Sequence, residues 1–128
     1  MTSSLCVQFL RLNQWARELA LALASPADQR HHEPLPKGGS VPVHDHEDHF
    51  VYLMVGKATF SVVENGQIAQ SNVLGDDENL NAVVIPRGVM HQWDDADEGA
   101  QIHDVRGLEK IAQILQAQVS PACPCAVG

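Results

Sequence analysis

The chain of 128 residues has only three cysteines, one tyrosine and eight basic residues. Cys6, Cys123 and Cys125 are too few and too unevenly placed to form a disulfide framework, so we expect a protein of the reducing cytoplasm. A long apolar run is also missing. The most apolar stretch, residues 5–24, is interrupted by charged and amide side chains. It therefore resembles neither a membrane span of ~20 apolar residues nor a secretory signal.

The shortage of basic residues also excludes partners. Sixteen Asp and Glu residues outweigh the eight Lys and Arg residues and give a formal charge of −8. A nucleic-acid-binding protein normally carries a basic surface for the phosphates, and anionic lipid attracts basic segments, so neither partner is expected. Hydrophobic residues make up 45% and charged residues 19% of the chain, which is typical of a globular protein. The length predicts a single domain.

Helical periodicity appears at both ends of the chain. Apolar residues at positions 5, 9, 12, 16, 19 and 23 form one stripe, which predicts an N-terminal helix over residues 1–25. Ser3 or Ser4 is its expected N-cap, and Pro26 follows its end. Residues 107–119 form a second helix with one apolar face. These faces must cover the domain's own sheet, which is the favoured alternative for the first helix, or a partner subunit. Two apolar helices at the chain ends also make a homodimer a reasonable expectation.

Between the two helices, the apolar pattern changes to a period of two. Tight turns separate the segments, and Asn65-Gly66 between apolar runs is the strongest hairpin signal. Many short strands of this kind predict an antiparallel sandwich or a small barrel. The predicted strands are residues 41–49, 50–55, 58–63, 67–73, 82–85, 89–93 and 100–106.

Four of the seven histidines lie in the middle of the chain. His44 and His46 are two apart on a predicted strand, so their side chains point to the same face. His49 is at an odd offset and needs a bulge to join them, and His91 follows a tight turn on a later strand. Neutral imidazole is a common metal ligand, so this constellation predicts a metal site.

Two motifs carry a resemblance to a known family. The run Gly38-x5-His44-x-His46, with Gly56 further on, resembles the first cupin motif, G-x5-H-x-H-x3,4-E-x6-G. Pro86-x-Gly88-x2-His91 is similar to the core of the second motif, P-x-G-x2-H. The resemblance implies an all-β, double-sheet β-barrel (jelly roll) over residues 38–106 with flanking N- and C-terminal helices, in a single cupin domain of residues 1–128. It also implies a divalent metal, Fe, Mn, Ni or Zn, and is compatible with a homodimer.

The first motif departs from the family pattern at its glutamate. Counting back from Gly56 places His49 where the family has Glu, while Glu47 fits the offset poorly. The resemblance is therefore to cupins with all-histidine sites. The implied metal ligands are His44, His46, His49 and His91.

The remaining candidates concern a pocket and a reaction. Tyr52, Trp93 and His103 could line the pocket, although aromatic residues in a small barrel usually belong to the core, and for His103 a surface or packing role is the favoured alternative. Arg87 and Arg106 could hold a substrate carboxylate. The expected function is that of a metal-dependent enzyme, such as a dioxygenase, acting on a small molecule. The alternative is a non-catalytic cupin that binds or senses a small ligand. No catalytic residue follows from the sequence.

Overall fold

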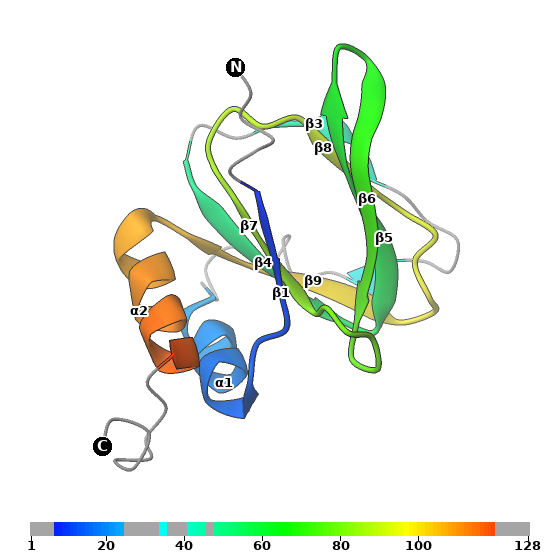
Figure 1. Cartoon of the computed structure of the whole chain (residues 1–128). Coiled ribbons are helices and arrows are strands. Elements are labelled where there is room, and N and C mark those ends of the chain that lie inside the picture. Colours follow the sequence, from blue (N-terminus) through cyan, green and yellow to red (C-terminus); the bar gives the residue numbers. More distant parts are fainter. Residues whose placement is uncertain (1–6, 25–33, 36–40, 46–47, 120–128) are drawn as a thin grey trace.

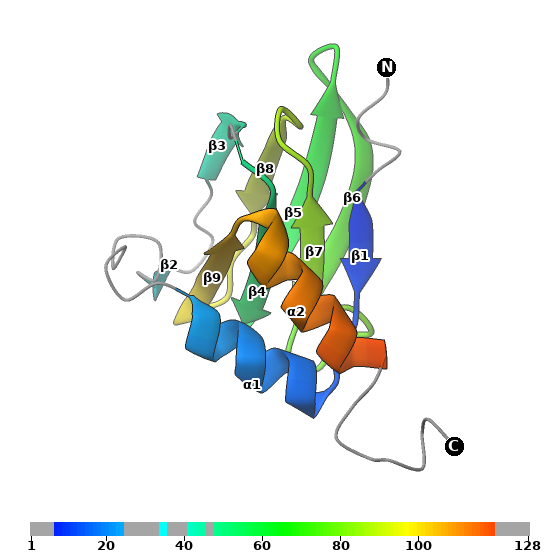
Figure 2. The ribbon, with the colours of Figure 1, turned by 90° about the vertical axis from the view of Figure 1, so that its left-hand side faces the viewer.

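The computed structural model describes residues 7–24, 34–35, 41–45 and 48–119 of the chain. These residues form two antiparallel sheets and two helices, arranged as three layers (Figure 1). Both helices lie against the outer face of one sheet, and the second sheet lies on the other side of it (Figure 2). The predicted double-sheet, mainly β architecture with flanking helices is therefore confirmed. The described strand pairings keep the two sheets separate.

The sheet beneath the helices has five strands in the order β1-β7-β4-β9-β2. The second sheet has four strands in the order β3-β8-β5-β6. The strands of the first sheet are β1 (Gln8–Leu10), β7 (Ala82–Ile85), β4 (Phe50–Val55), β9 (Ala100–Arg106) and β2 (Pro34–Leu35). Those of the second are β3 (Val41–His44), β8 (His91–Asp94), β5 (Lys57–Glu64) and β6 (Gln67–Gly75).

Strand β4 shows how the layers are built. Its alternate residues Phe50, Tyr52 and Met54 belong to the core between the two sheets. Val51 and Leu53, which point the opposite way, belong to the core beneath the helices. Because both faces are buried, the strand is apolar throughout and lacks the alternation of a half-exposed strand.

The two helices close the outer layer. Helix α1 (Gln14–Leu23) begins after Asn13, whose side chain accepts a hydrogen bond from the Ala16 N–H at 2.9 Å. Helix α2 (Leu108–Val119) buries Ile111 and Ile114 in the same core. The Asn13 N–H also donates to the Gln118 side chain at 2.8 Å, which ties the start of α1 to the end of α2.

The predicted hairpin is confirmed. Strands β5 and β6 pair from Lys57–Gly75 to Glu64–Gln67, and Asn65 and Gly66 occupy the turn with φ of 54° and 76°. Two consecutive positive φ values are those of a type I′ turn, for which Asn-Gly is the preferred pair.

The predicted N-terminal helix over residues 1–25 is wrong in its first half. Residues 8–10 form strand β1, which pairs with β7, and the helix starts only at Gln14, with Asn13 and neither Ser3 nor Ser4 as its cap. The Phe9 ring packs edge-on against the Phe60 ring, with centroids 5.9 Å apart. As part of strand β1, Phe9 can reach the core between the two sheets. Residues 1–6 lie outside the described part of the chain.

The apolar faces of the helices are used within the domain, since α1 and α2 pack on each other and on the first sheet. The apolar helix faces from which a homodimer was predicted are thus buried within the domain, and the dimer stays a prediction. Within the described residues, no helix combines the length and the apolar character needed to cross a membrane.

Candidate functional site

His91 lies at the start of β8, in the core between the sheets, with 0% of its surface exposed. Its Nδ1 atom is 2.7 Å from the Val89 carbonyl oxygen. A carbonyl can only accept a hydrogen bond, so Nδ1 carries a proton, and in the neutral ring the lone pair is on Nε2. A backbone carbonyl on one ring nitrogen is the usual way in which proteins orient a histidine for metal binding through the other.

The interior next to His91 Nε2 is both polar and aromatic. The Tyr52 hydroxyl is 3.4 Å from Nε2, at the long end of the hydrogen-bond range. The Phe60 ring stacks on the imidazole with centroids 5.5 Å apart. The Trp93 ring meets Phe60 at 4.8 Å and Tyr52 at 5.7 Å, edge-on in both cases. Tyr52 and Trp93, predicted as pocket residues, are thus placed in the packed core around His91.

Sequence reasoning missed a buried carboxylate, Asp104. It lies opposite Tyr52 in the β4–β9 pairing, and residues opposite each other in an antiparallel pair share a face. Only 8% of its surface is exposed. Burial, and then the charge of Asp104, raise the pKa of the Tyr52 phenol far above its ordinary value, so Tyr52 stays protonated and can donate to Nε2. The sequence pattern of β9 could have revealed Asp104. Ala100 and Ile102 point into the core between the sheets, and Asp104 is the next residue in this alternating series.

The structure describes the other predicted ligands only in part. The Cα atom of His44 lies opposite that of His91 in the β3–β8 pairing, which brings the first motif beside the second. The His44 side chain and the whole of His46 lie outside the described residues. Among the side chains that the structure describes, no group of three His, Cys, Asp or Glu residues is placed to hold a metal ion.

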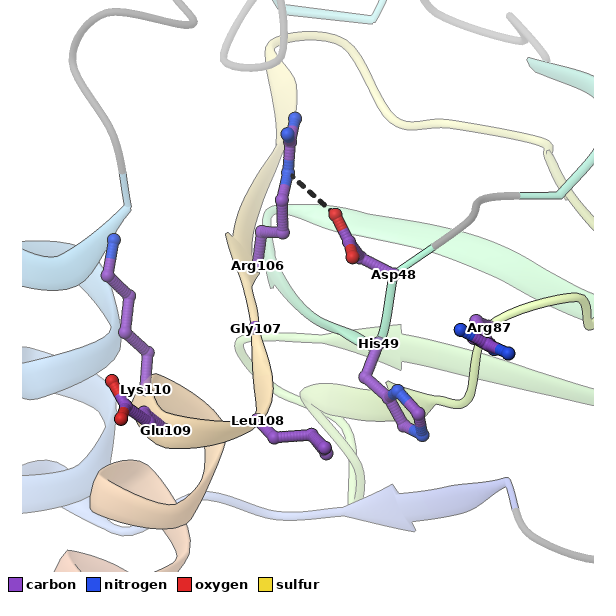
Figure 3. Close-up of a pocket in the computed structure, with 8 residues that line it drawn as sticks. All are labelled: Asp48, His49, Arg87, Arg106, Gly107, Leu108, Glu109 and Lys110. Atoms are coloured by element: carbon purple, nitrogen blue, oxygen red, sulfur yellow. Dashed lines mark ion pairs between the residues drawn. The ribbon is translucent and has the colours of Figure 1, made fainter.

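His49 lies away from this interior, in a surface pocket of about 450 Å³ (Figure 3). The pocket is formed by the start of β4, the β7–β8 turn, the end of β9 and the first turn of α2. The structure thus does not bring His49 and His91 together in one cluster, and the bulge that the four-histidine site requires is not described. The pocket is lined by Asp48, His49, Arg87, Arg106, Gly107, Leu108, Glu109 and Lys110.

His103 was considered as a pocket residue, but it lies elsewhere in the structure. It lies opposite Leu53 and two residues before Val105, and both of these belong to the core beneath the helices. Its Nε2 atom is 3.0 Å from the Gln101 side-chain oxygen. This placement favours the packing role.

Comparisons with known proteins give a likeness in structure only. No family model matches the chain, and no curated protein matches its sequence. Solved structures that match include an oxalate oxidase, with 21% identity and a TM-score of 0.43 over 54% of this chain and 35% of that one. KdgF from Halomonas matches with 21% identity and a TM-score of 0.43 over 56% of this chain and 60% of that one. A conserved Streptococcus pyogenes protein of unknown function matches with 17% identity and a TM-score of 0.43, over 58% and 59%.

The chain covers less than two thirds of the length of each of these three structures. Each likeness concerns the fold alone. The described architecture, two antiparallel sheets with His44 and His91 paired on adjacent strands, agrees with the cupin fold that the two motifs predict.

Proposed function

We propose that the protein is a metal-dependent cupin that binds one divalent cation through clustered histidines and acts on a small molecule, with dioxygenase chemistry as the reaction class. The observation that supports this is the state of His91. Its ring is buried, its Nδ1 proton is held by the Val89 carbonyl, and its Nε2 lone pair faces a polar interior. This environment suits a histidine that binds a metal ion through Nε2. The proposed ligands are His44, His46 and His91. The first motif also predicts His49, but its ring lines the surface pocket instead.

A bound Fe, Mn, Ni or Zn ion would supply Lewis acidity, and iron would in addition allow reaction with O₂. The chain's own residues prepare the site. Val89 fixes the tautomer of His91, and the protonated Tyr52 hydroxyl can donate a hydrogen bond to an anionic or oxygen-containing ligand. The rings of Phe60 and Trp93 exclude water around the imidazole, which strengthens polar interactions there.

One observation favours a second candidate, a cupin that binds a small ligand without catalysis. His91 is fully buried and lies within ring-contact distance of Tyr52 and Phe60. A metal held in such packed surroundings has less room for open coordination positions, which is the property of a structural site rather than a catalytic one.

The proposal is tested by metal analysis of protein purified without a histidine tag, before and after loading with Fe, Mn, Ni, Zn and Cu salts. We expect one equivalent of metal in the wild type and strong loss in His91→Asn, with His103→Asn as the matched control that keeps its metal. A wild type that takes up none of these metals contradicts the proposal. Water-proton relaxation of the Mn form then separates the two candidates, because an enzyme site keeps exchangeable coordinated water and a closed site does not.

A further inference from the structure

Positive charge is distributed very unevenly over the part of the chain that the structure describes. Six basic residues are described, and three of them, Arg87, Arg106 and Lys110, line the surface pocket. The other three lie against the acidic loop between β6 and β7: Arg17 pairs with Asp76 at 3.0 Å, Lys57 with Glu78 at 3.9 Å, and Arg11 donates to the Glu78 carbonyl. Of the thirteen described carboxylates, eleven lie outside the pocket.

The three cations of the pocket differ in their ion pairs. Arg87 and Lys110 form no ion pair with any described residue. Arg106 contacts Asp48 at 3.8 Å, with both side chains more than half exposed, and such a pair contributes little. Glu109 is the other carboxylate at the rim. In a chain with a formal charge of −8, this is a cationic pocket on an anionic protein.

The pocket also has a backbone contribution. Helix α2 begins at Leu108, and the Gly107 N–H is already used by the His49 carbonyl at 3.0 Å. The first N–H groups of a helix have no partner within the helix, so those that follow Gly107 add donors beside the three basic side chains. The cations come from the β7–β8 turn, the end of β9 and the first turn of α2, and in Figure 3 Arg87 and Lys110 are drawn on opposite sides of Arg106.

We propose that this pocket binds a small multivalent oxyanion, carrying carboxylate or phosphate groups, through Arg87, Arg106 and Lys110. The guanidinium fork matches both groups in two-point contacts, and Lys110 adds a third positive charge. A volume of about 450 Å³ is within the range of small-molecule sites. The site lies apart from His91, so binding does not depend on a metal or on the proposed function above.

The test is a nuclear magnetic resonance titration of the full-length chain, freed of metal on a chelating resin, with citrate, phosphate and neutral glycerol. We expect saturable shifts of the amides of residues 107–110 with at least one anion, weakening as NaCl is raised, and none with glycerol. The comparison of citrate with phosphate identifies the oxyanion group that the pocket prefers.

Variants separate a built site from general charge attraction. Arg87→Gln and Lys110→Gln should each weaken binding by about threefold to tenfold, whereas Lys57→Gln, which removes the same charge beside Glu78, should leave it unchanged. His91→Asn should bind the anion like the wild type, which keeps this result distinct from the metal experiment. No saturable shift with either anion, or equal weakening in Lys57→Gln and Arg87→Gln, would overturn the proposal.

Discussion

Gly56 offers a stability prediction whose magnitude follows from the structure. The residue joins β4 to β5 with φ of +89°, and a Cβ atom built on it would lie 2.8 Å from the Cα atom of Ala100. Gly56→Ala therefore has two costs. A non-glycine residue in the left-handed region costs about 1–2 kcal/mol, and displacing the fully buried Ala100 backbone costs about 1–3 kcal/mol. We expect the free energy of unfolding to fall by about 2–5 kcal/mol.

Gly66 provides the matched control. It has φ of +76°, but a Cβ atom there would meet nothing within 4 Å, so Gly66→Ala has only the backbone cost. With an m-value of about 1.5 kcal/mol per M, urea denaturation should show midpoints lowered by about 1.5–3 M for Gly56→Ala and about 1 M for Gly66→Ala. Equal midpoints for the two variants would refute the argument that Ala100 excludes a side chain at Gly56.

Three further predictions concern the site and the helical layer. His91→Asn should lose most bound metal in elemental analysis while His103→Asn keeps it; equal losses would show that the inward faces are misassigned. His49→Ala should leave the visible spectrum of the Co(II) form unchanged, because its ring lies in the surface pocket, and a changed spectrum would return His49 to the ligand set. Ile114→Ala should lower the free energy of unfolding by about 2–5 kcal/mol, more than Asn13→Ala at about 1 kcal/mol, measured in urea.

Strand positions could be predicted where turn residues mark both ends. The predicted segments 50–55, 82–85 and 100–106 coincide with β4, β7 and β9. Gly56 and Pro86 end the first two, and Gly107, with φ of +104°, ends the third. Elsewhere the bounds moved even beside a turn residue: β8 begins at His91 instead of residue 89, although Gly88 precedes that segment, and β6 extends to Gly75.

The N-terminal strand could not be predicted, because its partner is distant in the sequence. Apolar residues at positions 5, 9 and 12 fit a helical stripe, but Phe9 pairs with Val83 across more than 70 residues of chain. Local periodicity carries no information on such a pairing, and the tertiary contact overrides the helical pattern. The same limit applies to α1 and α2, whose contact with each other joins the two ends of the described chain.

The site shows the same division between local and distant information. The two motifs predicted that His44 and His91 come together, and the β3–β8 pairing places their Cα atoms opposite each other. Asp104 could not be singled out, since its burial depends on the position of Tyr52 in the neighbouring strand. The cationic pocket likewise collects residues from three segments, although two of its members, Arg87 and Arg106, were recognised as candidates for binding a carboxylate.

The direction of β4 side chains decides which residue the first motif turns inward. Counting back from Gly56 selects His49 for the glutamate position, but the motif also allows three residues after its second histidine, and that count selects Phe50. Phe50 is 3% exposed and belongs to the core around Tyr52, whereas His49 is only partly buried and lines the surface pocket. An aromatic ring thus occupies the inward position, and β4 contributes no carboxylate there. Among the described residues, the one buried carboxylate is Asp104. The buried negative charge beside Tyr52 therefore comes from β9 and not from β4.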